Sequence, residues 1–520
     1  MFQRKIIIGS RGSELALWQA NYVLNLLHKL NCVAEIKIIE TKGDRIQEVA
    51  LNQISGMGFF TKEIEEALLN KEIDIAVHSN KDLPTTSPPG LKIAAVSDRE
   101  DPSELLIINK DAVDEQSVLS LKKNAIVGTS SPRRKSQILS FRHDLIIDDL
   151  RGNVPTRINK LRDKKYDAVM LAAAGVYRLN LSLEDFHVEK LAPEVFIPAP
   201  AQGVLALEIR ENDIELSGLL AKLNVKDVEA AIKFERTILN KFEGGCHLAL
   251  GAFTKAKENR FCTWITKSDS PDKVPARIYL EGADPNEIAK IAVEKLTHIR
   301  PCSVFISREL NKNSYFYKTL TAYNYFVRGK SLINTEIIKI NEIPDADWVF
   351  FSSSKAVEHF FEQGLLMNDN IKYAAIGSAT AEAIYRFNKK PSFVGANSEM
   401  NDVGKEFLKM VKNQRILFPK SKQSIRTIQK ELLDENIVLD LNVYETLFLN
   451  DFEERNENVL AFTSPSNAKS YLNKFEIREN QKVIAIGTST KDQLIQMGIK
   501  EVKVASIPNE IGLAEAVFSL

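Results

Sequence analysis

The sequence predicts an α/β protein that is built from several domains. Short runs rich in β-branched residues alternate with amphipathic helical patterns through most of the chain, which is typical of parallel α/β architecture. A chain of 520 residues exceeds what one hydrophobic core usually serves, so at roughly 100 to 200 residues per domain we expect about three to five domains. The stretch from about 217 to 298 departs from this pattern and predicts a smaller α+β domain.

The first elements show the α/β pattern. Residues 5–9, KIIIG, predict a strand, and Ser13 lies where the N-cap of the following helix would be. The helical period places five apolar side chains on one face of that helix: Leu15, Trp18, Tyr22, Leu26 and Leu30. Further strands are predicted at 73–77, 91–96, 125–127 and 168–172. In the smaller domain a helix is predicted around 226–241, with short strands beside Cys246.

A second α/β pattern begins after Pro301, with a strand predicted at 303–306, and it contains a faint internal repeat. A strand and hydroxyl-rich loop at 348–356 lead to a glycine turn at 375–380, and the same order recurs at 460–468 and 485–490. The phenylalanine-to-glycine spacing is 26 residues in the first copy and 25 in the second. The repeat predicts two similar lobes with a site between them. Alternatively, these loops are ordinary helix N-caps.

The composition bounds the class of protein. Lys+Arg and Asp+Glu both number 69, so no global charge favours nucleic acid or an anionic membrane. With 44% hydrophobic and 27% charged residues, disorder is not expected. Neither a signal peptide nor a transmembrane run is recognised, and the four cysteines form no CxxC pair, so we expect reduced thiols and a cytoplasmic protein.

Arginines and serines gather near predicted strand-to-helix turns. In a doubly wound sheet such turns share one edge, so guanidinium groups there would converge on carboxylates or phosphates. A surface with scattered salt bridges is the alternative for any single arginine. The residues concerned are Arg11, Ser130, Ser131, Arg133, Arg134, Arg151, Arg157 and Arg178.

The stretch IDIAVHSNKDLP, residues 73–84, takes a buried-looking strand into a loop that contains Lys81 and Asp82. Loops at the carboxyl ends of parallel strands often hold reactive groups. Asp82, flanked by cations, would stay ionised and is a candidate acid/base that could also stabilise a developing cation. The alternative is an aspartate that caps a turn before proline.

The stretch EGGCHLALG, residues 243–251, raises the question of what Cys246 does. His247 is adjacent and would rarely face the thiol, so a nucleophile with its base is disfavoured. With seven histidines and no CxxC pair a metal site is also disfavoured, and we predict no bound metal. A buried structural thiol and a tethered group, suggested by the preceding Gly-Gly, both remain open.

Six ordered stretches of the first half resemble the porphobilinogen deaminase family, also called hydroxymethylbilane synthases. They are KIIIGSRGSELAL at 5–17, GMGFFTKE at 56–63, and residues 77–84, 128–134, 150–157 and 235–251. The resemblance covers about residues 4 to 300. Residues 302 to 520 are similar to uroporphyrinogen-III synthases, with an FTS-type loop and a following glycine turn in each repeat.

The resemblance implies two lobes like those of periplasmic binding proteins, a small α+β domain, and then a two-lobed α/β synthase module. The implied divisions are 1–98 with 197–216, 99–196, 217–300, 302–340 with 445–520, and 341–444.

In this family a cysteine that matches Cys246 carries a covalent dipyrromethane cofactor, which is made from substrate and primes the growing chain. By implication Asp82 assists loss of ammonia from porphobilinogen, and four cycles followed by hydrolysis release hydroxymethylbilane. The resemblance assigns cofactor and product carboxylates to the arginines named above, with Ser13, Lys81, Ser130 and Ser131 nearby. Tethering makes each attack intramolecular, where proximity can supply several of the ~7–11 kcal/mol available from this source.

Three residues depart from the family pattern. Met57 stands in place of a lysine in the GKG-type loop, Ala201 in place of the first glycine of a GQG motif, and Ala249 in place of a proline after the cysteine. Because the catalytic and anchoring positions match, we expect altered loop rates and a retained activity.

The synthase resemblance implies ring closure of hydroxymethylbilane with inversion of its last ring and loss of water. Ser353, Thr380, Tyr444 and Ser464 match loops and the hinge of that family. Tyr444 could assist departure of the hydroxyl group, and a packed hinge tyrosine is the alternative.

The sequence therefore predicts a bifunctional, monomeric enzyme that acts on small molecules and has neither nucleic-acid nor membrane partners. One alternative keeps the deaminase and makes the synthase half inactive or structural. Another is a non-catalytic polyanion-binding protein with Cys246 merely structural.

Overall fold

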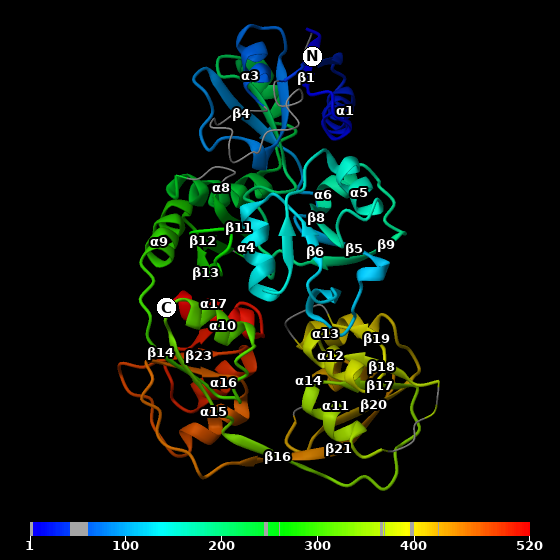
Figure 1. Cartoon of the computed structure of the whole chain (residues 1–520), viewed down its shortest axis with the longest axis vertical. Helices are drawn as coiled ribbons and strands as arrows, with labels where there is room; N and C mark the ends of the chain where they lie inside the picture. The colour runs from blue at the N-terminus through cyan, green and yellow to red at the C-terminus, as the bar shows by residue number, and fades with distance from the viewer. Residues whose placement is uncertain are drawn as a thin grey trace. The chain divides into compact units, whose positions relative to one another are not determined.

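The computed structural model describes residues 4–41, 61–243, 248–258, 260–364, 368, 370–395, 400–424 and 426–520. The chain divides into two compact units, Met1–Arg300 with Ala514–Leu520 and Pro301–Leu513. Figure 1 shows the elements of each. In the described part of the chain, every helix is too short or too polar to cross a lipid bilayer.

The first sheet of unit 1 has the strand order β2-β1-β3-β10-β4. Its strands are β1 (Ile6–Ser10), β2 (Ala34–Ile38), β3 (Ile75–Ser79), β4 (Leu91–Val96) and β10 (Leu205–Arg210). β10 runs antiparallel to its two neighbours, whereas β1 pairs in parallel with β2 and β3. The helices are α1 (Glu14–Lys29), α3 (Lys62–Leu69) and α7 (Ile214–Leu220).

Helix α1 buries a face adjacent to the apolar stripe that the sequence suggests. Ser13 is its N-cap and accepts from the Ala16 N–H, as predicted. Ala20, Val23 and Leu27 are fully buried in the core of the first sheet. The stripe from Leu15 to Leu30 is only half-buried, because Trp18 and Tyr22 stack on each other beside the core.

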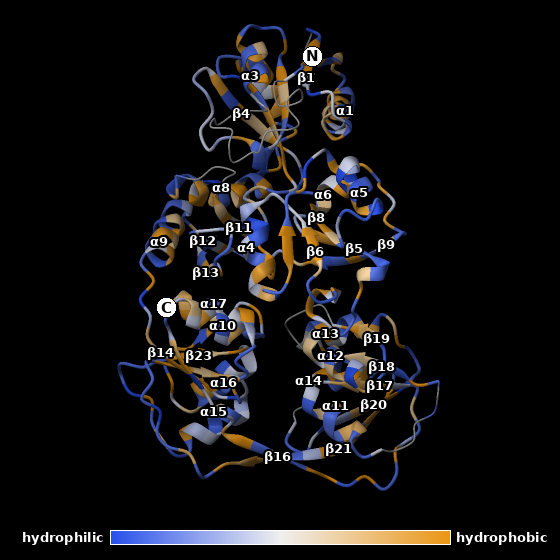
Figure 2. Cartoon of the chain, in the orientation of Figure 1, coloured by the Kyte–Doolittle hydropathy of each residue, from blue (hydrophilic) through white to orange (hydrophobic). Residues whose placement is uncertain are grey.

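The second sheet has the order β7-β6-β8-β5-β9. Its strands are β5 (Glu104–Asn109), β6 (Ile126–Gly128), β7 (Ile146–Asp148), β8 (Ala168–Ala172) and β9 (Phe186–Leu191), and its helices are α4 (Pro132–Phe141), α5 (Val154–Arg162) and α6 (Ala173–Arg178). Apolar side chains cover both faces of this sheet and form two cores. Figure 2 shows β5, β6 and β8 correspondingly coloured as hydrophobic.

The chain crosses between these two sheets twice, at 97–103 and at 192–204. The crossings are hydrogen-bonded to each other: the Ser97 N–H donates to the Leu205 carbonyl and the Glu100 N–H to the Gly203 carbonyl, each at 3.0 Å. Gly203 has φ +90°, and a Cβ there would lie 2.2 Å from the Glu100 carbonyl oxygen. This close approach requires glycine.

The third sheet of unit 1 is antiparallel, β11-β12-β13. It comprises β11 (Ala249–Lys257), β12 (Arg260–Ser268) and β13 (Ala276–Gly282), packed with α8 (Lys226–Lys241) and α9 (Pro285–Thr297). The α+β character predicted for 217–298 is confirmed, and α8 has the bounds expected from the sequence. Residues 514–520 also belong to this unit, where Glu515 pairs with Arg277 of β13 at 3.1 Å.

Unit 2 contains two further sheets, β15-β14-β22-β23-β24 and β16-β21-β20-β17-β18-β19. The first comprises β14 (Ser303–Ile306), β15 (Phe326–Gly329), β22 (Val459–Phe462), β23 (Lys482–Ala485) and β24 (Lys503–Val504). The second comprises β16 (Ile333–Ile337), β17 (Trp348–Phe351), β18 (Lys372–Ala375), β19 (Pro391–Val394), β20 (Arg415–Ser421) and β21 (Ile437–Phe448). The helices are α10 (Tyr315–Ala322), α11 (Ser354–Phe361), α12 (Ser378–Arg386), α13 (Met400–Leu408), α14 (Thr427–Leu432), α15 (Pro465–Leu472) and α16 (Thr488–Gln496). The last helix, α17 (Glu510–Phe518), begins in unit 2 and ends in unit 1.

Strands β16 and β21 form the antiparallel pair through which the chain passes between these sheets (Figure 1). The sequence-based division groups residues 302–340 with 445–520, and its boundary at 444 falls inside β21, which pairs with β16 in the sheet of β17. The cause is a non-local ladder that runs from Ile333↔Phe448 to Ile337↔Tyr444.

The internal repeat is visible in the backbone of unit 2. Ser353 caps α11 with φ −162° and ψ 152°, and Ser464 caps α15 with φ −162° and ψ 157°. Gly377 and Gly487, which cap α12 and α16, are likewise both extended. The hydroxyl-rich loops are therefore N-caps, as the plainer interpretation held, and they also occupy equivalent places in two similar units.

Candidate functional site

The Asp82 loop follows β3 as a single turn of 3₁₀ helix, Asn80–Asp82. The buried Asn80 donates its N–H to the Val204 carbonyl at 2.9 Å, which ties the loop to the second crossing. Lys81 Nζ donates to Gln202 Oε1 at 3.4 Å. Asp82 itself is exposed. The turn thus holds the backbone in place and presents the Asp82 carboxylate outward.

Cations from the second sheet face this loop. Burial lowers the pKa of Lys81, Asp82 opposes that effect, and Arg134 adds to it. Burial and then Arg134 lower the pKa of Arg157 to about 10, again opposed by Asp82. Asp82 and Arg134 both act on Lys81 and on Arg157, so the structure places these four charged groups near one another.

Arg133 and Arg134 share a buried carboxylate, that of Glu104 on β5. Arg133 Nη2 donates to Glu104 Oε1 and Arg134 Nη2 to Glu104 Oε2, both at 2.7 Å, and all three side chains are almost fully buried. Burial would raise the pKa of Glu104, but Arg134 and Arg133 outweigh it and hold that pKa at about 2. Gln202 Nε2 also donates to Glu104 at 3.2 Å.

Sequence reasoning missed Glu104. The sequence feature that could have revealed it is a glutamate at the start of the apolar run ELLII, residues 104–108, in a strand that is buried throughout. A charged residue in such a strand is seldom buried without a partner.

The serines of the second sheet act locally. Ser130 Oγ donates to the Leu150 carbonyl at 3.1 Å and accepts from the Leu150 N–H at 3.0 Å, which joins two turns. Ser131 is the N-cap of α4 and accepts from the Arg134 N–H. The Arg151 carbonyl accepts from Lys160 Nζ at 3.0 Å. These contacts fix the turns that carry the arginines.

Positive charge exceeds negative charge in this group of residues. Among the described residues, the Arg157 guanidinium makes one hydrogen bond, from Nε to the Gly152 carbonyl at 2.7 Å, and its terminal amino groups have no partner. Lys81 contacts only an amide oxygen there. Four cations, Lys81, Arg133, Arg134 and Arg157, face the carboxylates of Glu104 and Asp82. Such a site suits an anionic ligand that carries several carboxylates.

Arg11 and Ser13 lie at the end of β1, on the same sheet as the Asp82 loop. Arg178 lies elsewhere: its Nη2 donates to the Gly203 carbonyl and its guanidinium stands 5.5 Å from the centre of the Trp18 ring. It lines a cavity of about 140 Å³ with Trp18 and Tyr22. The structure therefore places Arg178 against the crossing segments.

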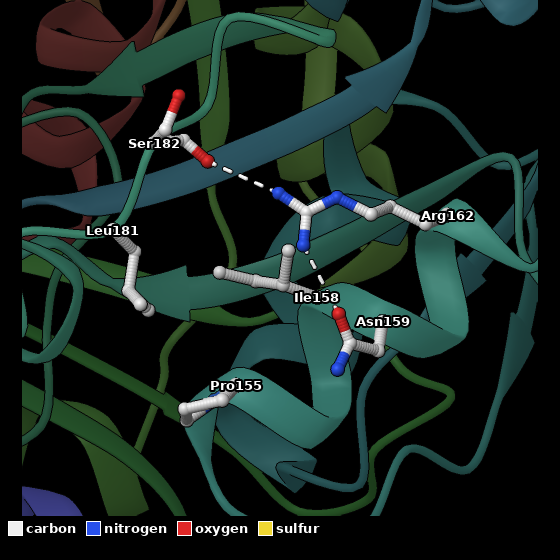
Figure 3. A pocket seen from close by; sticks show the side chains of 6 residues that line it. All are labelled: Pro155, Ile158, Asn159, Arg162, Leu181 and Ser182. Carbon is white, nitrogen blue, oxygen red and sulfur yellow. Dashed lines mark hydrogen bonds between the residues drawn. The ribbon is translucent and has the colours of Figure 1, made fainter.

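A second cavity, of about 60 Å³, lies beside α5 (Figure 3). Arg162 reaches across it, donating to Asn159 Oδ1 at 3.0 Å and to the Ser182 carbonyl at 3.3 Å. None of the predicted site residues lines this cavity.

Cys246, His247 and Met57 lie outside the described residues. Ala249 is the buried first residue of β11 and pairs with Ser268, a strand position where proline is also tolerated. Ala201 has φ +60°, a left-handed conformation that favours the glycine of the family pattern.

Glu235 of α8 links three parts of unit 1 and was not assigned a role from the sequence. Its fully buried carboxylate accepts two bonds from Arg99, at 2.7 and 3.2 Å. It also accepts from the N–H groups of Ala201, at 2.6 Å, and Thr254, at 2.8 Å. The sequence could have revealed this buried carboxylate, because Glu235 lies on the apolar face of α8, three residues from both Ile232 and Ile238.

In unit 2 the Tyr444 hydroxyl lies 3.5 Å from Ser353 Oγ. The imidazole of His359, on α11, packs on the Tyr444 ring with 5.1 Å between centroids, and its Nε2 lies 2.8 Å from Thr335 Oγ1. Burial raises the pKa of Tyr444, while Ser353 and Lys355 oppose that effect. Sequence reasoning missed His359, the single histidine of residues 301–520.

The other two synthase candidates lie on other helices. Ser464 caps α15 in the other sheet, accepting from the Asn467 N–H at 3.1 Å. Thr380 is buried in α12. The structure thus brings Ser353 and Tyr444 together and places Ser464 at the equivalent turn of the second repeat.

Within the described ranges, no group of three or more histidine, cysteine, aspartate or glutamate side chains is arranged to hold a metal ion.

Comparison with known proteins supplies the families. Residues 6–218 match the family model "Porphobilinogen deaminase, dipyromethane cofactor binding domain", and residues 332–515 match "Uroporphyrinogen-III synthase HemD". The porphobilinogen deaminase of Oceanobacillus iheyensis is 42% identical over 295 residues, which covers 56% of this chain and 94% of that protein. That of Bacillus subtilis is 42% identical over 290 residues, covering 55% and 91%.

A solved structure of uroporphyrinogen-III synthetase from Helicobacter pylori aligns with 42% of this chain and 99% of its own length, at 21% identity and a TM-score of 0.33. The sequence resemblance and both family matches agree on the order of the two parts. The chain belongs to the porphobilinogen deaminase family and carries, after the deaminase part, a uroporphyrinogen-III synthase domain.

Proposed function

We propose that this chain makes uroporphyrinogen III from porphobilinogen in two reactions. The first part joins four porphobilinogen molecules into hydroxymethylbilane and releases ammonia. The second part closes that linear product, inverts its last ring and releases water. The observation that carries the proposal is the surplus of cations around Asp82, two of them buried and two half-buried, in a domain whose family binds a dipyrromethane cofactor.

The site residues fit such a cofactor because its acid side chains would supply the missing negative charge. Cys246 would hold the dipyrromethane through a thioether, and that group supplies a tethered primer for chain growth. Arg157 and Lys81 bind its carboxylates, since both are cations left without a carboxylate partner of their own in the described chain. Glu104 fixes the guanidinium groups of Arg133 and Arg134 in place through its two ion pairs.

Arg11 and Arg151 extend the cationic surface toward the incoming and growing substrate, and Ser13, Ser130 and Ser131 fix the turns that carry it. Arg178 acts at the crossing between the lobes. Asp82 is the catalytic residue: its carboxylate passes a proton as ammonia leaves and stabilises the cationic substrate that results. Its exposed position leaves it accessible to porphobilinogen.

In the second part, Tyr444 donates its hydroxyl proton to the departing hydroxyl group of hydroxymethylbilane. Burial keeps the phenol protonated by raising its pKa, so it is available as a proton donor at neutral pH. The N-capping loops of Ser353 and Ser464 offer hydroxyl groups to the substrate, and Thr380 supports the glycine turn from the first turn of α12.

Intact-mass measurement of the purified full chain tests the first reaction. After expression with porphobilinogen available, the mass should exceed that of the polypeptide by one dipyrromethane, and Cys246→Ser should abolish the increment. An unmodified wild-type chain would exclude the tethered cofactor and favour a polyanion-binding protein.

Chromatography of the products made from porphobilinogen alone tests the second reaction. The wild type should give the type III isomer and Tyr444→Phe a larger share of type I, which arises when hydroxymethylbilane cyclises unaided. If the wild type gives only type I, the synthase half is inactive or structural.

We also propose that the chain is a cytoplasmic monomer without nucleic-acid or membrane partners, and that it has the five-part division expected from the sequence. Light scattering on the purified chain should give a mass near the 58.5 kDa of one polypeptide. A mass of twice that value would contradict the monomer.

A further inference from the structure

One side of helix α8 contacts the Asp82 loop at both of its ends. Arg236 Nη1 donates to the carbonyl of Asn80 at 3.1 Å and to Asn80 Oδ1 at 3.0 Å, and Arg236 Nη2 donates to the carbonyl of Pro84. One helical turn further along α8, Asn240 Oδ1 accepts from Thr85 Oγ1 at 3.2 Å. The contacts therefore bracket Asp82, two residues away on each side.

Arg236 makes these bonds without a carboxylate partner among the described residues. The side chain is half-buried, and burial lowers its pKa. A desolvated guanidinium is costly, so its position on carbonyl oxygens is informative. Its planar fork directs several N–H groups at once, which lets one side chain join two separated points of a backbone. Arg236 thus holds the loop through hydrogen bonds to its backbone and not through an ion pair.

The other restraints on the loop lie before Asp82, where Asn80 bonds to Val204 and Lys81 to Gln202. Its single 3₁₀ turn is closed by the Leu83 N–H, which donates to the Asn80 carbonyl at a long 3.3 Å, and no side chain caps the turn. Asn80 is anchored to Val204, but beyond Asp82 the tie from Arg236 to Pro84 is the side-chain contact on the loop backbone. The second crossing thus holds the loop before Asp82, and α8 holds it beyond Asp82.

We propose that Arg236 is a positioning residue for the deaminase reaction: it holds the Asp82 loop against α8 and so fixes the Asp82 carboxylate relative to the substrate. This inference rests on the proposed role of Asp82. It also links the loop to the third sheet, because α8 packs on β11 and is tied through Glu235 to Ala201 of the second crossing.

The test compares Arg236→Gln with Lys233→Gln, which removes an exposed cation from the same helix. Both variants are measured in the full chain for cofactor loading by intact mass, for thermal midpoint, and for kcat and KM on the loaded enzyme. Arg236→Gln should lower kcat by about 10- to 100-fold, the scale of a misplacement near 1 Å, and leave KM within about twofold. Lys233→Gln should match the wild type.

A double-mutant cycle with Asp82→Asn separates positioning from general stability. If Arg236 acts through the Asp82 carboxylate, Arg236→Gln should lower kcat far less in the Asp82→Asn background than in the wild type. Equal losses in both backgrounds, or a loss explained wholly by lower loading or melting, would overturn the proposal. So would a wild-type kcat for Arg236→Gln.

Arg236→Lys keeps the charge and replaces the Gln variant in the cycle if the latter does not fold. A lysine ammonium cannot span the Asn80 and Pro84 carbonyls together, so kcat should still fall about 10-fold or more, and full activity for this variant would also overturn the proposal. If Asp82→Asn alone retains wild-type kcat, the proposed role of Asp82 fails instead, which is a distinguishable result.

Discussion

The two halves of the chain place polar groups at their candidate sites in different ways. In unit 1 the groups are charged and largely buried, with Glu104 between Arg133 and Arg134 and with Arg157 and Lys81 left over as cations. In unit 2 they are hydroxyl groups at helix N-caps, with Tyr444 and His359 packed beside them. A polymerising site must hold many carboxylates in turn, whereas a cyclising site mainly folds one substrate.

The two halves should therefore respond differently to substitutions at their sites. Removing one member of a buried charge network leaves an uncompensated charge, while removing a hydroxyl from a half-buried cap costs about 1 kcal/mol. Variants in unit 1 should therefore have large effects on both stability and activity, and variants in unit 2 should have small effects on stability.

The largest effect is expected for Glu104→Gln. Two desolvated guanidinium groups would lose their shared carboxylate, so the free energy of unfolding of unit 1 should fall by about 3–5 kcal/mol. Pulse proteolysis in urea, read on peptides of residues 1–300, measures this. The exposed Glu115 supplies the control, since Glu115→Gln should leave the midpoint unchanged.

Acid should destabilise the wild type through the same carboxylate, because protonation removes the negative charge of Glu104. The pKa of Glu104 is depressed to about 2, below its unfolded value near 4.5, so its contribution is complete above pH ~4.5 and is lost as pH falls through about 2. Glu104→Gln should lack this part of the pH dependence. Identical acid profiles for the two proteins would contradict the assignment.

Arg157→Gln should reduce activity more than stability. Because its terminal amino groups have no partner in the described structure, their loss removes bonds to a ligand carboxylate worth about 1.5–3 kcal/mol, or about 10- to 100-fold in kcat/KM. Steady-state rates and cofactor loading measure this. Arg162→Gln, on the same helix and beside the small cavity of Figure 3, is the control and should keep wild-type rates. Equal losses for both would point to damage to α5 itself.

A smaller effect, visible only with pH, is expected in unit 2. Burial lowers the pKa of His359 below its usual 6.5. Glu362 and Glu358 oppose this effect, and Lys355 adds to it. The unfolded chain therefore binds the proton more readily, so stability should fall as pH drops through about 6.5 toward the folded pKa. His359 is the single histidine of this half, so His359→Gln should flatten that dependence.

Pulse proteolysis read on peptides of residues 301–513 measures the effect between about pH 5 and 7.5, the interval in which histidine titrates. Peptides of unit 1 supply an internal control, because their midpoints should not respond to the substitution. A wild-type slope that persists in His359→Gln would assign the dependence to other groups.

Local patterns predicted much of the fold. The strands at 91–96, 168–172 and 303–306 and the helix at 226–241 have the expected bounds, because their periodicity and flanking turns are local properties. The boundary expected at 444 falls inside β21, because the far end of that strand pairs with β16, which lies about a hundred residues earlier in the chain. The site divides likewise: the Asp82 loop and the arginine turns could be predicted, whereas Glu104 and Arg236 act through non-local contacts that one sequence does not reveal.

The smallest effect is expected for Ala201→Gly. Ala201 has φ +60°, where an L-residue is disfavoured by about 1–2 kcal/mol, but its buried methyl group contributes about 0.8 kcal/mol. The balance predicts a gain of up to about 1 kcal/mol in the free energy of unfolding of unit 1. Ala206→Gly, a buried position in β10 with extended backbone, should lose about 1 kcal/mol instead. Opposite signs would show that strain at the second crossing is relieved, and a loss at both positions would show that packing of the methyl group dominates there.

The converse substitution in unit 2 is Gly377→Ala. Gly377 has extended backbone, and a Cβ there would meet no atom within 4 Å, so alanine should be tolerated at this turn.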